Sequence, residues 1–470
     1  MKYLVSSTPR WLTFFAIASL LGVLPVLAQQ KTRPPMFEDI VITDGKRPAP
    51  TPTPGIRPTG SSQPIGAAPI ASNRKTSIQA LAEVDIPGYS GVLVESLDGE
   101  VLLDSYGDAA FNPASNVKVA TAYAVLSTFG VDYRFRTDIW TDGEVDPATG
   151  TLNGNLYVSG RDPMFNLEHG VHLAHELNAM GVNKIEGDLI VTDNFAMNYS
   201  ASSKQSGYLL QRTLDGTKRT NAAASAWAKH RINTGKVVST QAIPSVSVGG
   251  DLYVESIPTN ARLLLSHEST PLKEIVKVTM SYSNNFLAER LGDMLGGAYG
   301  VSRKVHNDAG VSPGEFSLQT CSGLGINRVT PRAQIRLLRT FRSFLQKNRM
   351  SFTDVMPVAG IDDGTLKGRY NDAFNIGSVV GKTGTLPRTD SGVSTLSGQV
   401  TTRTGTYLFV IFNQRGSVGR FRSFQNSFVP LLQNVLGGAV KMPYVPVSMD
   451  KRLAHTRILY PDGRRSRTED

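Results

Sequence analysis

The most constraining feature of this chain is a helix that must be buried, encoded by FNPASNVKVATAYAVLSTFG from Phe111 to Gly130. Asn112 can cap its start, Pro113 suits the first helical position, and Gly130 ends it. Apolar residues recur at helical spacing between these signals: Val119, Ala122, Val125, Leu126 and Phe129. Because such an apolar helix is stable only when it is packed, the chain must build a hydrophobic core around it.

Two polar residues near the start of this helix raise a question of chemistry. Ser115 and Lys118 are three residues apart and therefore share one face of the helix. A serine hydroxyl becomes a good nucleophile only when a base takes its proton, and a lysine can be that base only if burial or another cation lowers its pKa. Taken alone, this spacing more often marks an ordinary polar helix start than a catalytic pair.

The first residues have the form of an export signal. Lys2 and Arg10 supply a positive end, Leu12 to Leu24 is a mostly apolar run, and Val26 to Ala28 has the small-x-small form of a cleavage site. The apolar run is shorter than the roughly 18 to 20 residues of a spanning helix, so we expect cleavage and no transmembrane helix afterwards. The mature protein is expected in the periplasm or another extracytoplasmic cell-wall space.

Composition limits how the rest of the chain is held together and what it binds. Residues 29–77 are rich in Pro, Thr, Ser and Gly, which predicts an extended tether. Cys321 is the only cysteine, so no intramolecular disulfide can form and the core must hold the fold. The net charge of +10 favours anionic surfaces such as cell-wall polymers, but no basic helix or aromatic-interleaved patch points to nucleic acid.

Strand and helix patterns alternate along the remaining chain. Residues 91–105 are typical of a β-hairpin, and residues 391–414 of two long antiparallel strands. Strand-like runs around one helical run, residues 166–181, indicate a separate lobe between about residues 133 and 265. A second helical region starts at Thr270-Pro271 and is expected to break near Ser281 to Asn285, and FQNSFVPLLQNVLGG is expected to form a closing helix.

Two further triplets strengthen the catalytic interpretation of the serine and lysine. Ser283-Asn284-Asn285 falls at the expected helix break, and Lys382-Thr383-Gly384 directly precedes a long expected strand. Their groups suit four tasks around a serine nucleophile: proton relay by Ser283, orientation of a substrate amide by Asn285, attraction of a carboxylate by Lys382, and room for an extended substrate at Gly384.

Several longer stretches carry a family resemblance. They are FNPASNVKVATAYAVL, SYSNNFLAERLG, SGLGINRVTPR, MPVAGIDDGTLKGR and VGKTGTLPRTDSGVSTLSGQV. With the three triplets in the order used by penicillin-interacting serine enzymes, residues from about 77 to about 438 resemble the class C low-molecular-mass penicillin-binding proteins, the D-alanyl-D-alanine carboxypeptidase/endopeptidase family. The resemblance implies these roles: Ser115 as acylated nucleophile, Lys118 as general base, Ser283 and Asn285 as second motif, Lys382, Thr383, Gly384 and Thr385 as substrate-binding strand, and the backbone N–H groups of Ser115 and Thr385 as oxyanion hole.

The resemblance also implies a fold and a domain plan. The fold would be α+β, with a helical cluster packed on an antiparallel sheet as in β-lactamases and transpeptidases. A mainly β lobe would be inserted between the first and second motifs. The expected boundaries are a signal peptide at 1–28, the tether at 29–77, a split catalytic domain at 78–135 and 266–440, the inserted lobe at 136–265, and a C-terminal tail at 441–470.

The implied function is a serine-type D-Ala-D-Ala carboxypeptidase, a hydrolase that removes the terminal D-alanine of peptidoglycan stem peptides through an acyl-enzyme. Endopeptidase action on cross-links is a related possibility, and β-lactams are expected to acylate the same serine. No cofactor or metal is implied. Two alternatives stay open: a β-lactamase of the same fold, and a catalytically weak cell-wall-binding protein that keeps the fold.

Two departures from the family pattern bear on activity. Where such proteins usually have Asp-Gly-Ser-Gly-Leu, this chain has Thr320-Cys321-Ser322-Gly323-Leu324, which loses a carboxylate. The usual Gly-Gly-Asp-Pro of the lobe is Gly160-Arg161-Asp162-Pro163, which leaves Asp162 as a weaker candidate for substrate contact. The segment between the first and second motifs also looks shorter than in the largest members.

Three other groups are better explained by structure than by chemistry. His169, His172 and His175 recur every three residues on one expected helix, but no carboxylate or cysteine motif completes a metal site there. Cys321 in a Gly-rich turn is more often a packing residue than a reactive thiol. Asp362 and Asp363 are adjacent in a turn and face different ways, which favours a turn role over a pair of acid-base carboxylates.

Overall fold

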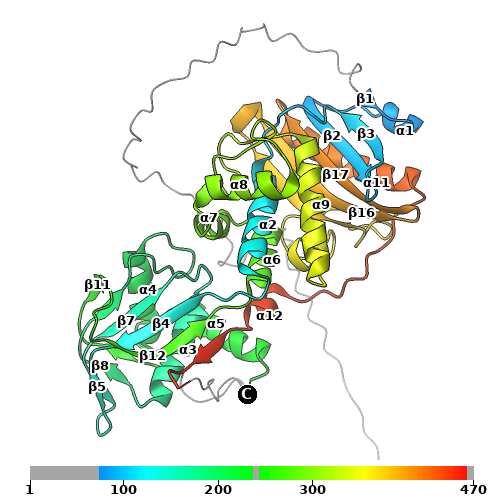
Figure 1. Cartoon of the computed structure of the whole chain (residues 1–470). Helices are drawn as coiled ribbons and strands as arrows, with labels where there is room; N and C mark the ends of the chain where they lie inside the picture. The colour runs from blue at the N-terminus through cyan, green and yellow to red at the C-terminus, as the bar shows by residue number, and fades with distance from the viewer. Residues whose placement is uncertain (1–73, 237–242, 463–470) are drawn as a thin grey trace, which may run out of the picture. The chain divides into compact units, whose positions relative to one another are not determined.

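The computed structural model describes residues 74–236 and 243–462 (Figure 1). The expected signal peptide, residues 1–28, therefore lies outside the described residues, as does the expected tether up to residue 73. In the described part of the chain, no helix has the length and apolar character needed to cross a membrane. The described residues contain both helices and strands, and the strands form separate sheets.

The first sheet has six strands in the order β1-β3-β2-β17-β16-β15, and every neighbouring pair is antiparallel. Its strands are β1 Arg74–Lys75, β2 Tyr89–Ser96, β3 Val101–Ser105, β15 Val379–Leu386, β16 Val393–Thr402 and β17 Gly405–Gln414. Strand β17 pairs with β2, so the sheet joins segments that are about three hundred residues apart. The predicted hairpin and the two predicted long strands are both confirmed.

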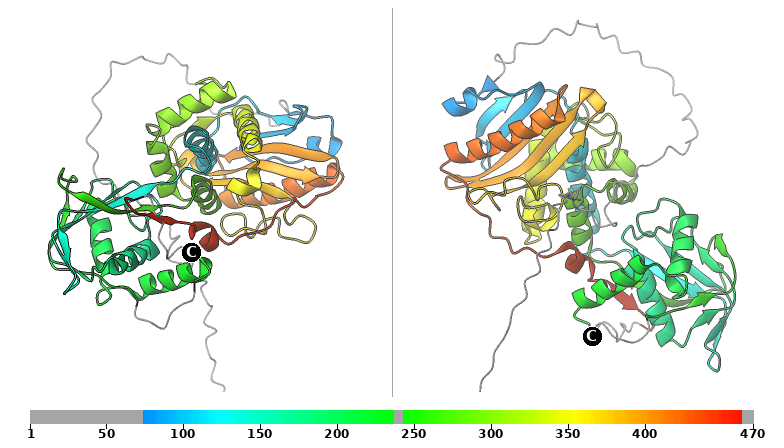
Figure 2. Two further views of the ribbon diagram at one scale, coloured as in Figure 1. Left: turned by 60° about the horizontal axis from the view of Figure 1, so that its bottom comes forward. Right: turned by 180° about the vertical axis from the view of Figure 1, so that it is seen from behind.

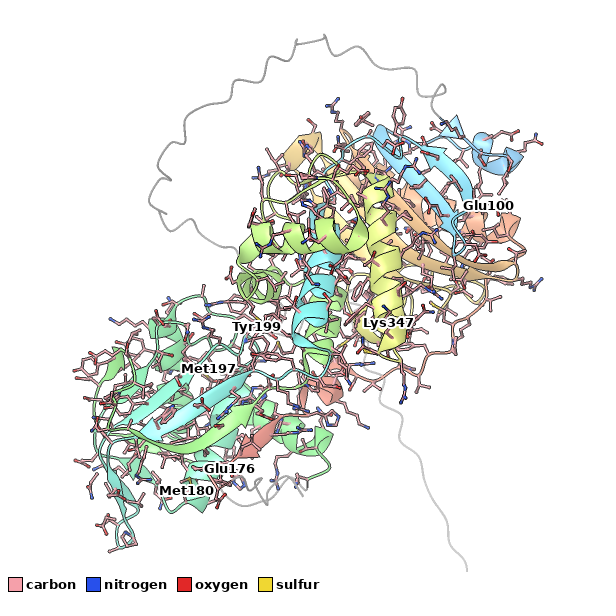
Figure 3. All side chains as sticks on the ribbon, in the orientation of Figure 1. Glu100, Glu176, Met180, Met197, Tyr199 and Lys347 are labelled. Carbon is pink, nitrogen blue, oxygen red and sulfur yellow. The ribbon has the colours of Figure 1, made fainter. Side chains whose placement is uncertain are left out.

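Helices cover both faces of this sheet (Figures 1 and 2). The helices of this part are α1 Gln79–Ala82, α2 Val117–Phe129, α6 Leu272–Tyr282, α7 Asn285–Asp293, α8 Gly297–Ala309, α9 Pro331–Lys347, α10 Phe352–Val355 and α11 Val418–Val435. Alternate residues of β2 face opposite ways: Val92 and Val94 share a buried cluster with Phe428 of α11, whereas a Cβ at Gly91 would meet Pro331 of α9. Figure 3 marks Glu100 in the turn after β2 and Lys347 at the end of α9.

Helix α2 is the buried helix that the sequence requires. Every residue from Val117 to Leu126 is buried, and the helix packs against α6, α7, α8 and α9 (Figure 1). A 3-10 turn, Ala114–Asn116, comes before it, and Gly130 ends it as predicted. The second helical region breaks as predicted, because α6 ends at Tyr282 and α7 begins at Asn285. A two-stranded ladder, β13 Phe316–Ser317 with β14 Arg328–Val329, lies between α8 and α9 in the sequence.

Residues 136–268, called the lobe below, form two further sheets and three helices, and a later strand, β18 Arg457–Leu459, joins one of these sheets. One sheet has the order β10-β8-β6-β5 and the other β11-β9-β7-β4-β12-β18, each with parallel and antiparallel pairs. The elements are β4 Arg136–Thr141, β5 Glu144–Asp146, β6 Thr151–Asn153, β7 Leu156–Gly160, α3 Leu167–Ala179, β8 Lys184–Ile185, β9 Leu189–Val191, α4 Ser203–Leu214, α5 Asn221–Asn233, β10 Ser247–Val248, β11 Leu252–Val254 and β12 Arg262–Glu268. Helices α4 and α5 were not indicated by the sequence.

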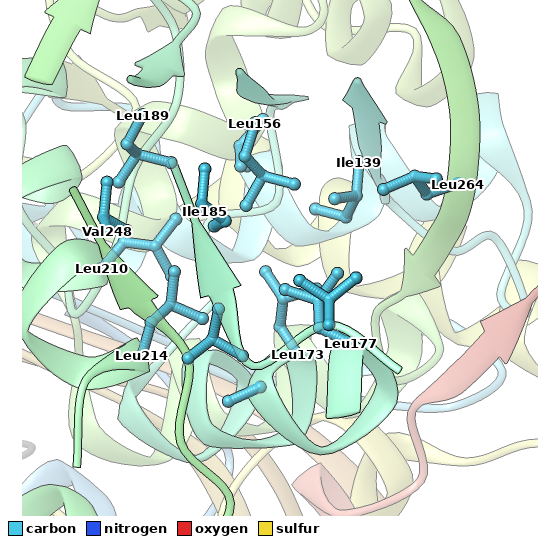
Figure 4. Close-up of a cluster of buried hydrophobic side chains, with 14 of the residues drawn as sticks. Ile139, Leu156, Leu173, Leu177, Ile185, Leu189, Leu210, Leu214, Val248 and Leu264 are labelled. Atoms are coloured by element: carbon cyan, nitrogen blue, oxygen red, sulfur yellow. The ribbon is translucent and has the colours of Figure 1, made fainter. Parts of the chain in front are cut away.

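The lobe has its own hydrophobic core. Buried side chains from its strands and from α3 and α4 form one cluster, including Ile139, Leu156, Leu173, Leu189 and Leu210 (Figure 4). The cluster explains why the short strands of the lobe are stable, because each of them contributes an apolar side chain to a shared interior.

The segment expected as a C-terminal tail contributes to the fold. Residues 449–453 form α12, Met449–Leu453, and β18, Arg457–Leu459, pairs antiparallel with β12. Ile458 is buried in the core of the lobe. This end of the chain therefore adds an edge strand to a sheet of the lobe.

Candidate active site

Ser115 lies in the 3-10 turn that leads into α2. Ala114, directly before it, has a φ of 46°, a left-handed conformation that is costly for a residue other than glycine. The following residue fixes the turn, because the Asn116 amide donates to Thr395 Oγ1 at 2.7 Å and accepts from Ser397 Oγ at 2.6 Å. Both partners are on β16, so the strained turn is held firmly on the first sheet. Ser115 itself is partly exposed.

Lys118 is buried one turn further along, with 1% of its surface exposed. Its Nζ contacts three oxygen atoms: Oγ of Ser115 at 3.0 Å, Oδ1 of Asn285 at 2.7 Å, and the carbonyl oxygen of Ser322 at 2.6 Å. Burial lowers the pKa of Lys118 to about 7, and the negative charge of Glu289 opposes that shift. A substantial fraction of the lysine is therefore a neutral amine near neutral pH.

The three contacts orient that neutral amine. A neutral amine has two N–H bonds and one lone pair, whereas an amide oxygen and a backbone carbonyl can only accept hydrogen bonds. Both N–H bonds are therefore used by Asn285 and Ser322, and the lone pair is left for Ser115. The serine hydroxyl can donate to it, so the arrangement suits proton transfer from Oγ to Nζ.

The second motif occupies the junction between α6 and α7. Ser283 has a φ of 57° in the left-handed region, which ends α6. The side chain of Asn284 then accepts the N–H of Leu287 at 3.0 Å and caps α7. The two turns place Asn285 at the start of α7, where its side chain meets Lys118.

The third motif brings a second buried lysine to the same site. Nζ of Lys382 donates to Oγ of Ser283 at 2.8 Å and to the carbonyl of Thr383 at 2.7 Å. Burial, and then the positive charge of Lys118, hold the pKa of Lys382 well below its usual range. The structure thus brings all three predicted motifs together around Ser115.

Gly384 is needed for close packing of β15. A Cβ at this position would lie 2.9 Å from the Cβ of Ala114 and 2.9 Å from the carbonyl oxygen of Pro113, and it would overlap Oγ1 of Thr395. The direction of that Cβ is towards the turn before Ser115. From the sequence, this glycine was expected to leave room for a substrate; in the structure it allows β15 to approach the turn that contains Ser115.

The two threonines of β15 are partly exposed, in contrast to the buried residues between and beside them. Thr383 and Thr385 are two residues apart, so both side chains are on the same face of the strand. Arg422, near the start of α11, donates from Nη2 to Oγ1 of Thr385 at 3.0 Å and is exposed. The open side of β15 therefore has two hydroxyls and one cation.

Glu289 is a site residue that the sequence analysis missed. Its carboxylate accepts the backbone N–H of Ser322 at 2.9 Å and that of Cys321 at 3.1 Å. The spacing in the sequence could have identified Glu289, because it follows Asn285 by four residues and therefore lies on the same face of the helix. The Ser322 carbonyl could not have been found in this way, because any residue carries one.

Asp162 is not brought to this site. It is 1% exposed, its Oδ1 accepts the N–H of Met164 at 2.8 Å, and its Oδ2 is 3.9 Å from Nδ1 of His267. The candidate for substrate contact is thus enclosed inside the lobe. His169 and His172 are also buried, and His175 is partly buried. Among residues 74–236 and 243–462, no group of three or more His, Cys, Asp or Glu side chains is arranged to hold a metal ion.

Solved structures of other proteins have a similar fold. A predatory peptidoglycan endopeptidase from Bdellovibrio bacteriovorus matches with a TM-score of 0.65 at 22% identity, over 78% of this chain and 99% of that chain. A related structure from that organism is acylated by penicillin G. Penicillin binding protein 4 from Haemophilus influenzae matches with a TM-score of 0.54 at 20% identity, over 73% of this chain and 96% of that chain. These matches confirm the predicted α+β fold class.

Sequence comparisons agree with that fold. A D-alanyl-D-alanine carboxypeptidase from Actinomadura sp. is 27% identical over 421 residues, which are 68% of this chain and 77% of the relative. A carboxypeptidase from Mycobacterium tuberculosis is 25% identical over 80% of this chain and 87% of its own length. The model of the D-Ala-D-Ala carboxypeptidase 3 (S13) family matches residues 78–208 and 214–434, which is more than half of the chain. This chain therefore belongs to the D-Ala-D-Ala carboxypeptidase 3 (S13) family.

Proposed function

We propose that this protein is a serine-type D-Ala-D-Ala carboxypeptidase that trims peptidoglycan stem peptides in the extracytoplasmic wall space. The observation that carries the proposal is the buried Lys118, whose Nζ is 3.0 Å from Oγ of Ser115 while its other two contacts are oxygens that only accept. Family membership supports the substrate class, and the expected export signal supports the compartment.

In the proposed acylation step, Oγ of Ser115 attacks the carbonyl carbon between the two D-alanines as its proton passes to Nζ of Lys118. The backbone N–H groups of Ser115 and Thr385 stabilise the negative oxygen of the tetrahedral intermediate. The C–N bond then breaks, and the terminal D-alanine leaves after its nitrogen receives a proton through Lys118 and Ser283. Lys382 donates to Ser283, which keeps that hydroxyl in place.

In the proposed deacylation step, a water molecule attacks the acyl ester, Lys118 accepts the proton of the water, and Oγ of Ser115 leaves with a proton.

The hydroxyls of Thr383 and Thr385 on the open side of β15, with Arg422 beside them, would hold the carboxylate of the terminal D-alanine. A cross-linked dimer presents the same kind of bond to the same serine, so we also propose DD-endopeptidase action. A β-lactam presents a strained amide, and we expect it to acylate Ser115.

The test uses a fluorescent penicillin and a synthetic pentapeptide ending in D-Ala-D-Ala. Wild type should label covalently and release D-alanine, and Ser115→Ala should lose both signals by at least about a thousandfold. Ser127→Ala is the matched control, because this serine lies near the far end of α2, and its Oγ donates to the carbonyl of Ala124. Labelling that survives Ser115→Ala would overturn the proposal. Cross-linked muropeptide dimers, assayed in parallel, measure the endopeptidase activity.

A further inference from the structure

The turn from Thr320 to Leu324 is clamped between two helices. On one side, the carboxylate of Glu289 in α7 accepts the N–H groups of Cys321 and Ser322. On the other side, the carbonyl of Cys321 accepts from Oγ1 of Thr121 in α2 at 2.7 Å. The next carbonyl, that of Ser322, is thereby held on Nζ of Lys118 at 2.6 Å.

This clamp matters for the base, because the Ser322 carbonyl is one of the two oxygens that take the N–H bonds of a neutral Lys118. If the turn moved, one N–H bond would be free to rotate towards Ser115, and the lone pair would turn away from the hydroxyl that it has to deprotonate. The turn therefore controls the orientation of the amine as well as its burial.

We propose that Glu289 is a positioning residue for the Lys118 base: its carboxylate holds the Thr320 to Leu324 turn and supplies the negative charge that Lys118 faces. The inference rests on the proposed function, since it assigns a role within the same site. In this chain, which lacks the aspartate of the usual Asp-Gly-Ser-Gly-Leu pattern, a carboxylate from α7 secures the turn.

The charges around Lys118 determine the direction in which its pKa moves when Glu289 loses its charge. Lys382 faces it from β15, Glu289 from α7, and the buried Cys321 belongs to the turn beside it. Burial lowers the pKa of Lys118 to about 7 and Glu289 raises it. Removing the negative charge must therefore lower the pKa of Lys118 further and keep the amine neutral to lower pH.

Three variants separate charge from geometry. Glu289→Gln removes the charge and one of the two acceptor oxygens, so the acid limb of the acylation rate should move to lower pH by roughly 0.5 to 1 unit. Glu289→Asp keeps the charge but is one methylene shorter, so the rate should fall about tenfold with little movement of the acid limb. Asp293→Asn removes a carboxylate from the last turn of the same helix and should leave the acid limb unchanged.

The experiment measures the second-order rate of acylation by a fluorescent penicillin between pH 5 and 9, with thermal melting to verify that each variant is folded. A Glu289→Gln profile whose acid limb coincides with wild type, or with that of Asp293→Asn, would overturn the inference. So would a Glu289→Asp rate equal to wild type.

A second measurement does not depend on catalysis. Lysine labelled with ¹³C at Cε reports the protonation of each side chain by NMR, and Lys118→Arg assigns the signal. The pKa of Lys118 should be lower in Glu289→Gln than in wild type, and an unchanged value would contradict the inference. If wild type itself fails to react with penicillin, the proposed function fails while this titration still tests Glu289.

Discussion

At residue 292 the chain accommodates only glycine, because the side chain of Cys321 occupies the space. A Cβ at Gly292 would overlap Sγ of Cys321 and lie 2.7 Å from its Cβ. In an open helix, replacing glycine by alanine is stabilising by roughly 0.5 to 1 kcal/mol. Here we expect Gly292→Ala to lower the free energy of unfolding by about 1 to 3 kcal/mol, because overpacking outweighs the propensity gain. Urea unfolding checks the value.

The matched control for Gly292→Ala is the double variant with Cys321→Gly, which restores the glycine that the family pattern has at this position. It should recover most of the lost stability. A double variant as unstable as Gly292→Ala alone would show that the clash with Cys321 is not the cause. The burial of Cys321 agrees with the packing role expected from the sequence. Its contact with Gly292 could not be predicted, because the two residues meet only in the folded chain.

In the same turn, Thr320 stands where the Asp-Gly-Ser-Gly-Leu pattern has its aspartate. Oγ1 of Thr320 accepts the N–H of Gly323 at 3.0 Å and donates to the carbonyl of Leu324 at 2.8 Å. A threonine thus closes the turn through its hydroxyl, as short polar side chains do in turns. The departure is visible in the sequence, whereas the two hydrogen bonds of Thr320 depend on a turn geometry that the sequence does not specify.

Between elements, a buried ion pair ties α6 to the segment before β15. Nζ of Lys277 is 2.7 Å from Oδ2 of Asp362, and the two side chains are 0% and 2% exposed. Lys277 also donates to the carbonyls of Thr353 and Met356. Lys277→Met would leave the Asp362 carboxylate buried without its cation, so the free energy of unfolding should fall by about 3 to 5 kcal/mol. Chemical denaturation measures this loss.

Lys304→Met provides the surface comparison for that variant. Lys304 pairs with Asp308 at 2.6 Å, and both side chains are about a third exposed. Exposed pairs contribute roughly 0 to 1 kcal/mol, so this variant should be nearly neutral. Equal losses in the two variants would contradict the assigned role of the buried pair. The structure also agrees with the turn role expected for Asp362, because this carboxylate accepts the N–H of Val358 at 2.8 Å.

Elements were predictable from the sequence where a local signal and a tertiary requirement agree. Gly130 ends α2, residues that disfavour a helix interrupt the chain between α6 and α7, and β16 and β17 are long strand-like runs, so these local signals match the observed elements. Helix α5 was missed because its Ala-rich, polar sequence has no apolar stripe, and it is held by contacts of Ala223 and Trp227 with α3. Strand β18 was missed because only pairing with β12 makes three residues a strand.

At the scale of the whole molecule, the histidines are unevenly distributed. The chain has seven histidines. Five of them lie together in the lobe, and neighbouring rings have centroids between 4.7 and 6.4 Å apart: His169, His172, His175, His230 and His267. Glu176, labelled in Figure 3, is also on α3 and lies 3.3 Å from His172. The sequence showed three of these residues on one helix, but only the fold adds the two that come from α5 and β12.

This cluster should make the lobe sensitive to acid. Burial holds the pKa of His169 and of His267 well below the usual value and lowers that of His230 to about 3. The unfolded chain therefore binds more protons than the folded chain as the pH falls below about 6.5, and stability is lost. Burial raises the pKa of Asp162 and Glu168 to about 7, which acts in the opposite direction between pH 7 and about 4 and then ceases.

The expected result is a shallow loss of stability as the pH falls below about 6.5, and a steeper loss below about 4, where the opposing contribution of Asp162 and Glu168 has ceased. His267→Phe tests the cause, because neither ring nitrogen has a hydrogen-bond partner and an aromatic ring fits among Phe165 and His169. Removing one proton from the difference should reduce the slope by about 1.4 kcal/mol per pH unit between pH 6 and 4. Urea unfolding measured across that range gives the slope. A His267→Phe slope equal to wild type would refute the assignment.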